Sequence, residues 1–436
     1  MNIAIIGSGI SGLSSAWYAS KAGHQVSVFE KDVRFGGHAI ELSIPFKGKK
    51  VAVNPGYDLC NKVVYPKYVN LLEELGLDIQ PCEFSYSYRN LQDCESEDER
   101  TKTLPAFQKA ANLKQFFRPD FLRLALTTFK LSKKIDQFVA ETNKKNISFY
   151  SFLQDANVPQ DLIDSFFVPV SARPWGVRAT DMRDMPVTVI LDWINKLQIF
   201  TPRPSQMYKN TGGVKHYIDT FVTSLREQGV SLQSHAEVSK IIRVNNQVRI
   251  HFSDGHVKEF DGVVIASNAK VAMTLLDRPT ADEQRIFSLF RYQKNNVIVH
   301  SDERVMPKEK NKWRYFNIVY NPANHETFST MWFGIDKDLP VFSTNSREMP
   351  FKPEKIHAEF RFEQPIFDQN TVMAQSLLAG IQGDNNTWFS GVYCQGHGHH
   401  ESGVESGHRV AKSIDARSKI RSAEKREMNA EEVCVS

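Results

Sequence analysis

The order of apolar and polar residues divides the start of the chain into two short strands and a helix. Residues 3–6 are apolar at every position, which predicts a parallel strand buried on both faces. Residues 11–21 follow as a helix that stops at Ala22-Gly23, a common helix end. A second strand, residues 25–30, ends at Glu30. The chain therefore begins with a strand–helix–strand unit.

Further strand patterns lie late in the chain. Residues 229–267 are rich in strand formers, carry a hairpin signal at Asp254-Gly255, and end in the buried run 262–266. Residues 387–391 predict a short strand, followed by a glycine-broken loop and the beginning of a helix. Strand-forming segments thus recur at both ends of the chain.

Three glycines separate the first strand from the helix. Gly7, Gly9 and Gly12 form a G-x-G-x-x-G motif. The first glycine allows a tight turn, the second lets backbone approach a pyrophosphate, and the third lets the helix pack on the strand. The helix N-terminus attracts the phosphates, and Glu30 can accept the hydroxyl protons of an adenosine ribose. The unit therefore predicts a dinucleotide site, although a glycine-rich turn also occurs in unrelated αβ units.

A second glycine pair indicates which dinucleotide is bound. Gly36 and Gly37 follow soon after Glu30, so another backbone segment can approach the pyrophosphate, and Arg34 can offset its charge. This arrangement is typical of flavin enzymes rather than nicotinamide enzymes. A chain that used both cofactors would carry a second G-x-G-x-x-G near its middle, and this sequence has none there. We therefore expect FAD alone.

With these motifs, the chain resembles the flavin amine oxidase superfamily, which includes monoamine and polyamine oxidases and carotenoid-type desaturases. The R-x-G-G of residues 34–37 is one mark of it. From residue 2 to about 411 the chain is also similar to a bacterial branch of FAD-binding proteins often encoded beside cyclopropane-fatty-acid synthases. The segments that carry this similarity are "VNPGYDLCNKVVYPKYVNLLEELGL", "PVSARPWGVRATDMRDMP", "TGGVKHYI", "FRYQKNNVIVHSDERVMP" and "TWFSGVYCQGHGHHESGVESGHRVA". Two positions depart from the branch, because Asn54-Pro55-Gly56 replaces an acid–glycine pair and Gln364-Pro365 replaces a His-Pro pair.

The resemblance implies an α/β fold, with a Rossmann-type FAD-binding domain interleaved with an amine-oxidase-like α+β substrate domain. We expect the FAD-binding domain to comprise residues 1–58, 212–285 and 378–415. The substrate domain would comprise residues 59–211 and 286–377. Residues 416–436 would form a charged C-terminal tail, either a surface helix or a mobile segment.

The motifs and the resemblance together imply a set of FAD contacts. In similar flavoproteins a valine, here Val238, places backbone groups on the adenine, and the last segment aims a helix N-terminus at the N1–O2 edge of the flavin. Cys394 is not at the position where monoamine oxidases attach flavin, so the FAD is expected to be non-covalent. The residues expected to contact FAD are Gly7, Ser8, Gly9, Ser11, Gly12, Glu30, Lys31, Arg34, Gly36, Gly37, His38, Gly56, Val238, Gly391, Tyr393, His400, Gly403 and Val404.

The stretch "VYCQGHGHHESG", residues 392–403, also suggests other chemistry. Cys394, His397, His399 and His400 are metal-ligand residue types, and a cysteine beside a histidine can act as a nucleophile with its base. All four lie on one glycine-broken loop without a partner cluster elsewhere in the sequence. We therefore expect no metal, and interpret the stretch as the far wall of the flavin pocket.

Composition limits the partners and the location. The net charge is +4, and the five cysteines have no paired spacing, which favours reduced thiols in the cytoplasm. The sequence has neither a secretory signal pattern nor a run approaching the roughly 18 apolar residues of a membrane-spanning helix. Nothing in it resembles a nucleic-acid-binding motif.

Residues 101–150 hold ten Lys or Arg against three Asp or Glu. Apolar side chains are spaced loosely as helix faces among these basic residues: Phe107, Phe116, Phe117, Phe121, Leu122, Leu124, Leu126, Phe129 and Leu131. One interpretation is a peripheral surface that contacts an anionic membrane and admits a lipid. The other is an ordinary helical part of the substrate domain with a solvated basic face.

Three functions follow as hypotheses. The first is an FAD-dependent oxidoreductase that desaturates an unsaturated fatty acyl or other lipid substrate, or shifts its double bond, by hydride transfer to flavin N5. The second is an amine oxidase that releases peroxide, and the third is a non-catalytic flavin-binding protein. No catalytic residue is assigned. Lys294 invites comparison with the lysine near the flavin of amine oxidases, but equally fits an exposed lysine on an edge strand. Trp175 and residues 191–200 line an apolar tunnel or belong to the core.

Overall fold

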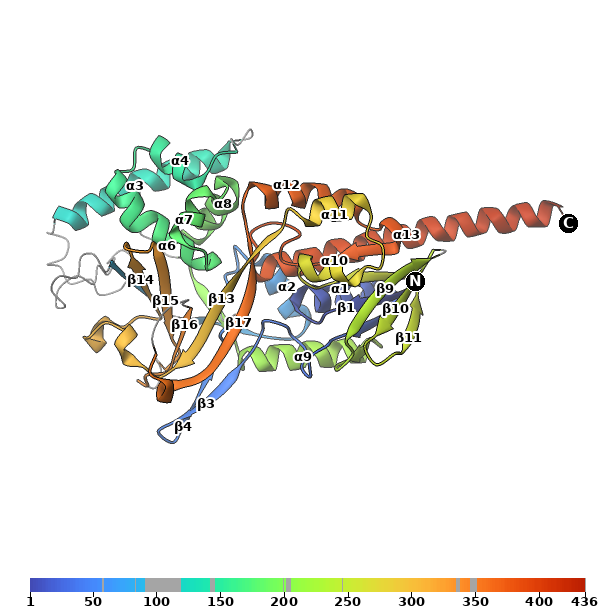
Figure 1. Cartoon of the computed structure of the whole chain (residues 1–436), viewed down its shortest axis with the longest axis horizontal. Helices are drawn as coiled ribbons and strands as arrows, with labels where there is room; N and C mark the ends of the chain where they lie inside the picture. Colours follow the sequence, from blue (N-terminus) through green and yellow to red (C-terminus); the bar gives the residue numbers. More distant parts are fainter. Residues whose placement is uncertain are drawn as a thin grey trace.

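The computed structural model describes residues 1–56, 59–82, 84–90, 119–141, 146–198, 200, 205–244, 246–334, 338–345 and 351–435, with the side chains of the last helix as far as Ala423. Two units lie side by side along its long axis, each built around one large sheet (Figure 1).

A five-stranded parallel sheet is the centre of the first unit. Its strands, in spatial order, are β18 (Thr387–Phe389), β12 (Gly262–Ile265), β1 (Asn2–Ile6), β2 (Gln25–Phe29) and β8 (Ser231–Gln233). Ile3, Ala4 and Ile5 of β1 are fully buried, as the apolar run predicts. The strand order reverses at β1, which lies between β2 and β12. At such a reversal the loops after the strands separate and leave a crevice for a ligand.

Helices and a smaller sheet surround this parallel sheet. They are α1 (Ile10–Lys21), α2 (Pro66–Glu74), α9 (Gly213–Glu227), α10 (Ala269–Leu275), α11 (Ala281–Phe287), α12 (Gln369–Leu378), α13 (His400–Val435), and the antiparallel strands β9 (Val238–Val244), β10 (Gln247–Phe252) and β11 (Val257–Phe260). Helices α1 and α13 pack closely, since a Cβ added at Gly403 would lie 2.6 Å from Ile10 Cγ2, and one at Gly407 2.6 Å from Ser15 N.

A six-stranded sheet is the centre of the second unit. Its spatial order is β17 (Ile356–Ile366), β13 (Arg291–His300), β16 (Phe342–Asn345), β15 (Glu326–Trp332), β14 (Phe316–Asn321) and β6 (Tyr86–Asn90). Neighbouring strands are antiparallel, except that β14 and β6 are parallel. Two small antiparallel sheets complete the strands: the hairpin of β3 (Leu42–Phe46) with β4 (Lys49–Val53), and β5 (Ile79–Cys82) with the sequence-distant β7 (Met207–Asn210).

A group of helices covers one end of the six-stranded sheet (Figure 1). They are α3 (Pro119–Ala140), α4 (Phe149–Asp155), α5 (Gln160–Leu162), a π-helical turn (Ile163–Phe167), α6 (Val168–Ala172), a 3₁₀ turn (Arg173–Trp175), α7 (Ala179–Asp184) and α8 (Val187–Leu197). Helix α8 is apolar on its inner face, where Ile190, Leu191 and Ile194 are buried.

The predicted fold class is confirmed: a parallel α/β unit built from distant segments accompanies a unit with a mixed sheet and helices. The domain bounds stay a prediction. The predicted tail, residues 416–436, continues α13 as a helix to Val435, and this helix projects beyond the body of the molecule (Figure 1).

Candidate functional site

The loop after β1 has the shape of a phosphate cradle. Gly7 has a φ of +104°, and a Cβ there would lie 2.7 Å from the carbonyl oxygen of Ala266. A Cβ on Gly12 would overlap the carbonyl oxygen of Gly7. The packing of the chain therefore requires both glycines. A Cβ on Gly9 would meet no atom of the described chain within 4 Å, which leaves this side of the loop open to an outside group.

The N-terminus of α1 faces the same loop. Gly9 is its N-cap, and among the described residues no side chain caps it. Its first N–H groups, near Ser11, and the positive end of the helix dipole are therefore available to an anion. The open side of Gly9 and this helix end together fit the pyrophosphate of a dinucleotide.

Glu30 holds the cradle against the end of β2. Its Oε2 accepts hydrogen bonds from the backbone N–H of Ser8, at 2.9 Å, and from Ser8 Oγ, at 2.6 Å. Its Oε1 accepts the N–H of Asp32 at 3.0 Å. The carboxylate is buried, whereas Lys31 beside it is exposed. Glu30 thus stands where the predicted ribose would lie, and it also fixes the glycine loop.

The second glycine pair touches the first. The N–H of Gly36 donates to the carbonyl oxygen of Ser8 at 2.9 Å, and a Cβ on Gly37 would lie 3.0 Å from Gly9 Cα. Arg34 donates through Nη2 to the carbonyl oxygen of Gly37 at 2.7 Å. Its guanidinium therefore braces this loop.

Two more predicted contacts lie at the ends of the cradle. The N–H of Ala236 donates to the carbonyl oxygen of Glu30 at 2.8 Å, which brings the buried Val238, two residues later, close to the end of β2. Gly56 packs against the backbone of His38, where a Cβ would overlap the His38 carbonyl oxygen. His38 turns its ring edge toward Phe362, with the centroids 4.7 Å apart.

The C-terminal segment joins this site through α13. The N–H of Gly391 donates to Ser406 Oγ at 3.0 Å, and Tyr393 is buried against Phe290 with the ring centroids 4.8 Å apart. The helix begins at His400, earlier than expected, and the N–H of Gly403 already donates to the His399 carbonyl oxygen at 3.3 Å. The N–H groups of Gly403 and Val404, which were expected to face the flavin, therefore lie inside the helix. The N–H groups at the helix N-terminus, which could face a ligand, lie nearer its first residue.

The three histidines of the C-terminal loop point in different directions. His397 Nε2 lies 3.5 Å from Asp192 Oδ2. The ring of His399 stacks on Trp193, with centroids 5.3 Å apart, and its Nε2 lies 3.4 Å from the Pro174 carbonyl oxygen. His400 Nε2 lies 3.3 Å from Tyr217 Oη. Within the described residues, no group of three or more His, Cys, Asp and Glu side chains could hold a metal ion.

Burial keeps these groups uncharged near neutral pH. It lowers the pKa of His399 and of His400 to about 3. It also raises the pKa of the Cys394 thiol to about 12, and the Cys394 sulfur lies 3.6 Å from the Phe389 carbonyl oxygen. Cys394 is therefore a half-buried, protonated thiol and a poor nucleophile.

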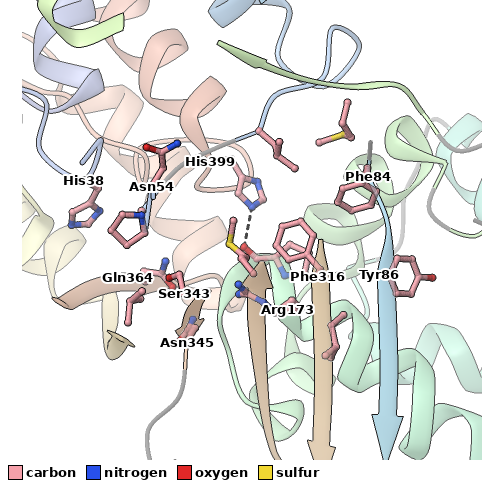
Figure 2. A pocket seen from close by; sticks show the side chains of 18 of the residues that line it. His38, Asn54, Phe84, Tyr86, Arg173, Phe316, Ser343, Asn345, Gln364 and His399 are labelled. Carbon is pink, nitrogen blue, oxygen red and sulfur yellow. Dashed lines mark hydrogen bonds between the residues drawn. The ribbon is translucent and has the colours of Figure 1, made fainter. Parts of the chain in front are cut away.

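A cavity of about 280 Å³ lies between the cradle and the six-stranded sheet (Figure 2). It is lined by His38, Asn54, Pro55, Gly56, Leu59, Tyr65, Phe84, Tyr86, Val170, Arg173, Pro174, Trp193, Leu197, Met207, Val297, Phe316, Ile318, Met331, Ser343, Asn345, Phe362, Gln364 and His399. Most of these side chains are apolar, and none of the described lining residues is Asp, Glu or Lys. His399 lines the cavity, whereas His400, expected near the flavin ring, packs on Tyr68 behind it, with centroids 4.7 Å apart.

Polar side chains from distant segments meet on the floor of this cavity. Arg173 lies near Phe316, with its guanidinium 6.0 Å from the ring centroid (Figure 2). Asn295 donates to the side-chain oxygen of Gln364, and a Cβ on Gly176 would lie 3.1 Å from Asn345 Nδ2. The sequence predictions assigned no role to Arg173 or Asn345. The only signal for Arg173 was its place in the shared segment "PVSARPWGVRATDMRDMP".

The sequence analysis considered two further features, a lysine near the flavin and an aromatic tunnel. Lys294 is exposed on β13, where it pairs with Glu363 of β17. Since β16 pairs with β13 only from Val297 to His300, the described strands flank β13 on one side at Lys294, as the edge-strand alternative expects. Of the aromatic residues proposed for a tunnel, Trp193 lines the cavity, and Trp175 lies behind it with centroids 5.1 Å apart.

The basic insertion is described only in part. Phe107, Phe116, Phe117 and the side chain of Phe121 lie outside the described residues. On α3, Leu124 and Leu131 are buried, while Leu122, Leu126 and Phe129 are 47%, 61% and 52% exposed. Among the helices of the described residues, none combines the length and the apolar composition that crossing a membrane requires.

Comparison with known proteins places this arrangement in a family. Over 57 residues the chain is 42% identical to a D-amino acid dehydrogenase of Agrobacterium fabrum, a match that covers 13% of this chain and only 12% of that protein. A fatty acid isomerase from P. acnes that produces CLA has a similar fold, with a TM-score of 0.67 and 15% identity over 95% of this chain and 97% of the other. The cyclohexylamine oxidase of Brevibacterium oxydans has a TM-score of 0.64 and 14% identity over 96% and 99% of the two chains.

These structural similarities extend over nearly the whole chain, and at such low identity they concern the fold alone. The sequence itself gives the assignment, because residues 10–338 match the family of flavin-containing amine oxidoreductases. That family carries a flavin cofactor, in agreement with the cradle described above. The chain therefore belongs to the flavin-containing amine oxidoreductase family and is a flavin oxidoreductase.

Proposed function

We propose that the chain is an FAD-dependent oxidoreductase that acts on an unsaturated fatty acyl or other lipid substrate, by dehydrogenation or by shifting a double bond. FAD, when bound, supplies hydride acceptance at its N5. Gly7, Gly9, Glu30 and the N-terminus of α1 would hold the dinucleotide, and the cavity would exclude water and orient the apolar substrate beside it.

The lining of the cavity carries this proposal. Its walls are mainly aliphatic and aromatic, which suits an apolar chain. Among the described residues that line it, Arg173 alone carries a permanent charge and none is a carboxylate. An ammonium group would therefore enter a positively charged, poorly solvated site without a counter-ion. This observation disfavours the amine oxidase alternative. The fold also serves a fatty acid isomerase, which is compatible with lipid chemistry.

The FAD is proposed to be bound without a covalent link. The Cys394 thiol is half-buried and protonated, and its sulfur is directed at the carbonyl of Phe389. Precipitation of the yellow protein with acid should therefore release all of the flavin into the supernatant. Flavin that stays in the pellet would contradict this part of the proposal.

Anaerobic reduction of the flavin tests the substrate class. We expect an unsaturated fatty acid to perturb or bleach the flavin absorbance, and cyclohexylamine and putrescine to leave it unchanged. Lipids extracted from cells with and without the protein should differ in the number or position of double bonds. Bleaching by an amine alone would overturn the proposal, and an inert flavin with unchanged lipids would favour a non-catalytic role.

We also propose peripheral contact with an anionic membrane through α3. Leu122, Leu126 and Phe129 recur at helical spacing and are exposed, and Lys130 and Lys133 are exposed beside them. Apolar side chains flanked by lysines suit the interface of an anionic bilayer.

Sedimentation with vesicles that contain phosphatidylglycerol tests this contact. Leu126→Glu with Phe129→Glu should weaken the binding, whereas Met373→Glu, at an equally exposed apolar position on α12, should not. Equal binding of both variants and the wild type would exclude α3 as the contact.

A further inference from the structure

One charged side chain in the cavity, that of Arg173, has no acidic partner among the residues that the structure describes. Arg173 begins the 3₁₀ turn after α6, so its side chain leaves the helical layer toward the six-stranded sheet. Its Nε has no hydrogen-bond partner, and across the described segments no carboxylate lies within ion-pair distance of its guanidinium. The nearby ring of Phe316, 6.0 Å away, offers only a weak cation–π contact.

The guanidinium remains charged in this setting. Burial lowers the pKa of Arg173 only to about 10, so the group stays protonated at neutral pH. The two histidines of the cavity do not share the charge, because burial lowers the pKa of both His38 and His399. The cavity therefore holds one uncompensated positive charge. Leaving such a charge buried and unpaired is costly, and a ligand anion removes that cost.

We propose that Arg173 anchors the carboxylate of an otherwise apolar substrate, so that the ligand of the cavity is a free carboxylic acid and neither an amine nor a neutral ester. This inference rests on the proposed function and narrows its substrate class. A planar guanidinium matches the two oxygens of a carboxylate through paired N–H donors. A phosphate headgroup carries more charge than the single cation of this cavity would balance.

The position of Arg173 also sets which part of the substrate reacts. In Figure 2, Arg173 lies between the His38 and Asn54 end of the cavity and the Phe84 and Tyr86 end. The cofactor cradle adjoins the first of these ends, since Gly56 and His38 belong to both. A carboxylate fixed at Arg173 therefore fixes how far along the chain the carbon nearest the flavin lies.

The test is a titration of the purified flavin-bound protein, followed by the change in flavin absorbance. The ligands are oleate, methyl oleate, oleoyl lysophosphatidate and the short acid 4-phenylbutyrate. The proteins are the wild type, Arg173→Gln, Arg173→Lys and the control Arg178→Gln. Arg178 lies five residues after Arg173, is exposed and pairs with Asp181. The flavin content of each protein verifies that its fold is intact, and Arg173→Lys keeps the charge if the glutamine variant does not fold.

The expected result is that the wild type and Arg178→Gln bind oleate about 10-fold or more tightly than methyl oleate, as a charge-assisted contact implies. Arg173→Gln should lose this preference while binding the ester as before, and Arg173→Lys should keep part of it. Equal binding of acid and ester by the wild type, or an acid preference that survives in Arg173→Gln, overturns the role of Arg173 and leaves the proposed function intact.

Other outcomes separate the two proposals. Tighter binding of the lysophosphatidate than of oleate overturns the assignment to a carboxylate. If none of the three oleoyl ligands binds but 4-phenylbutyrate does so in an Arg173-dependent way, the lipid substrate class fails and the anchor stands. If none of the four ligands binds the wild type, both proposals fail.

Discussion

Gly9→Ala should separate cofactor binding from folding. Gly9 has a φ of −66°, which alanine adopts readily, and a Cβ there would meet no atom of the described chain within 4 Å. Alanine is a poorer N-cap than glycine by about 0.5 kcal/mol. It also restricts the unfolded chain, which stabilises the fold by about 0.4–1 kcal/mol. The two effects nearly cancel, so the flavin-free protein should unfold within about 0.5 kcal/mol of the wild type.

Binding of FAD should respond differently, because the added methyl group lies where the pyrophosphate would approach. Displacement of the pyrophosphate from the helix N-terminus removes at least one charge-assisted hydrogen bond, worth about 1.5–3 kcal/mol. The dissociation constant of FAD should therefore rise about 10- to 150-fold. Quenching of flavin fluorescence measures this constant, and urea unfolding of the flavin-free protein measures the stability.

Two other glycines give the controls. Gly380→Ala, at an open position in the chain that the structure describes, should change neither quantity. Gly12→Ala places a Cβ on the Gly7 carbonyl and should destabilise the flavin-free fold by at least about 1–3 kcal/mol. If Gly9→Ala binds FAD as tightly as the wild type, or unfolds as readily as Gly12→Ala, the assignment of the cradle is refuted.

Two further predictions concern stability. Arg243 pairs with Glu283 through Nη1 at 2.5 Å, with the side chains 10% and 3% exposed, so Arg243→Met should cost about 3–5 kcal/mol in urea unfolding. Arg249 pairs with Glu259 at an exposed position, so Arg249→Met should lower the free energy of unfolding by less than about 1 kcal/mol. Equal losses in Arg243→Met and Arg249→Met would show that burial does not decide the cost. Burial lowers the pKa of His300 to about 4 in the folded chain. An unfolded histidine has a pKa near 6.5, so the unfolded chain gains the proton first as the pH falls. The contribution of this histidine is complete above about pH 6.5 and is lost toward pH 4, at up to about 1.4 kcal/mol per pH unit. Unfolding of His300→Gln at pH 7 and pH 5 should show a smaller pH slope than the wild type, and an unchanged slope would contradict the assignment.

The cofactor cradle could be proposed from the sequence because its determinants are local. Gly7, Gly9 and Gly12 lie within one turn and one helix start, and Glu30 ends the next strand. Their spacing along the chain therefore already fixes their spacing in the fold.

The floor of the cavity could not be predicted in this way. Arg173, Asn345 and Gln364 come from a helical turn and two strands that meet only in the tertiary structure. The sequence also could not show which of two adjacent histidines lines the cavity. At the start of α13, His399 lies in the cavity wall, whereas His400 lies next to Tyr217. A shift of one residue along a helix turns a side chain by about 100°, and periodicity does not show where a helix begins.

The close packing of α1 on α13 has a consequence for the order of assembly during synthesis. Gly403 and Gly407 sit against Ile10 and Ser15, and β18 adds the last strand of the parallel sheet. Helix α1 therefore waits for a segment that is made much later. At about 5–20 residues per second, the nascent chain spends tens of seconds with one face of α1 uncovered. The parallel sheet and the α1–α13 contact are complete only once residues 387–407 have been made, so stable FAD binding should follow the synthesis of that segment.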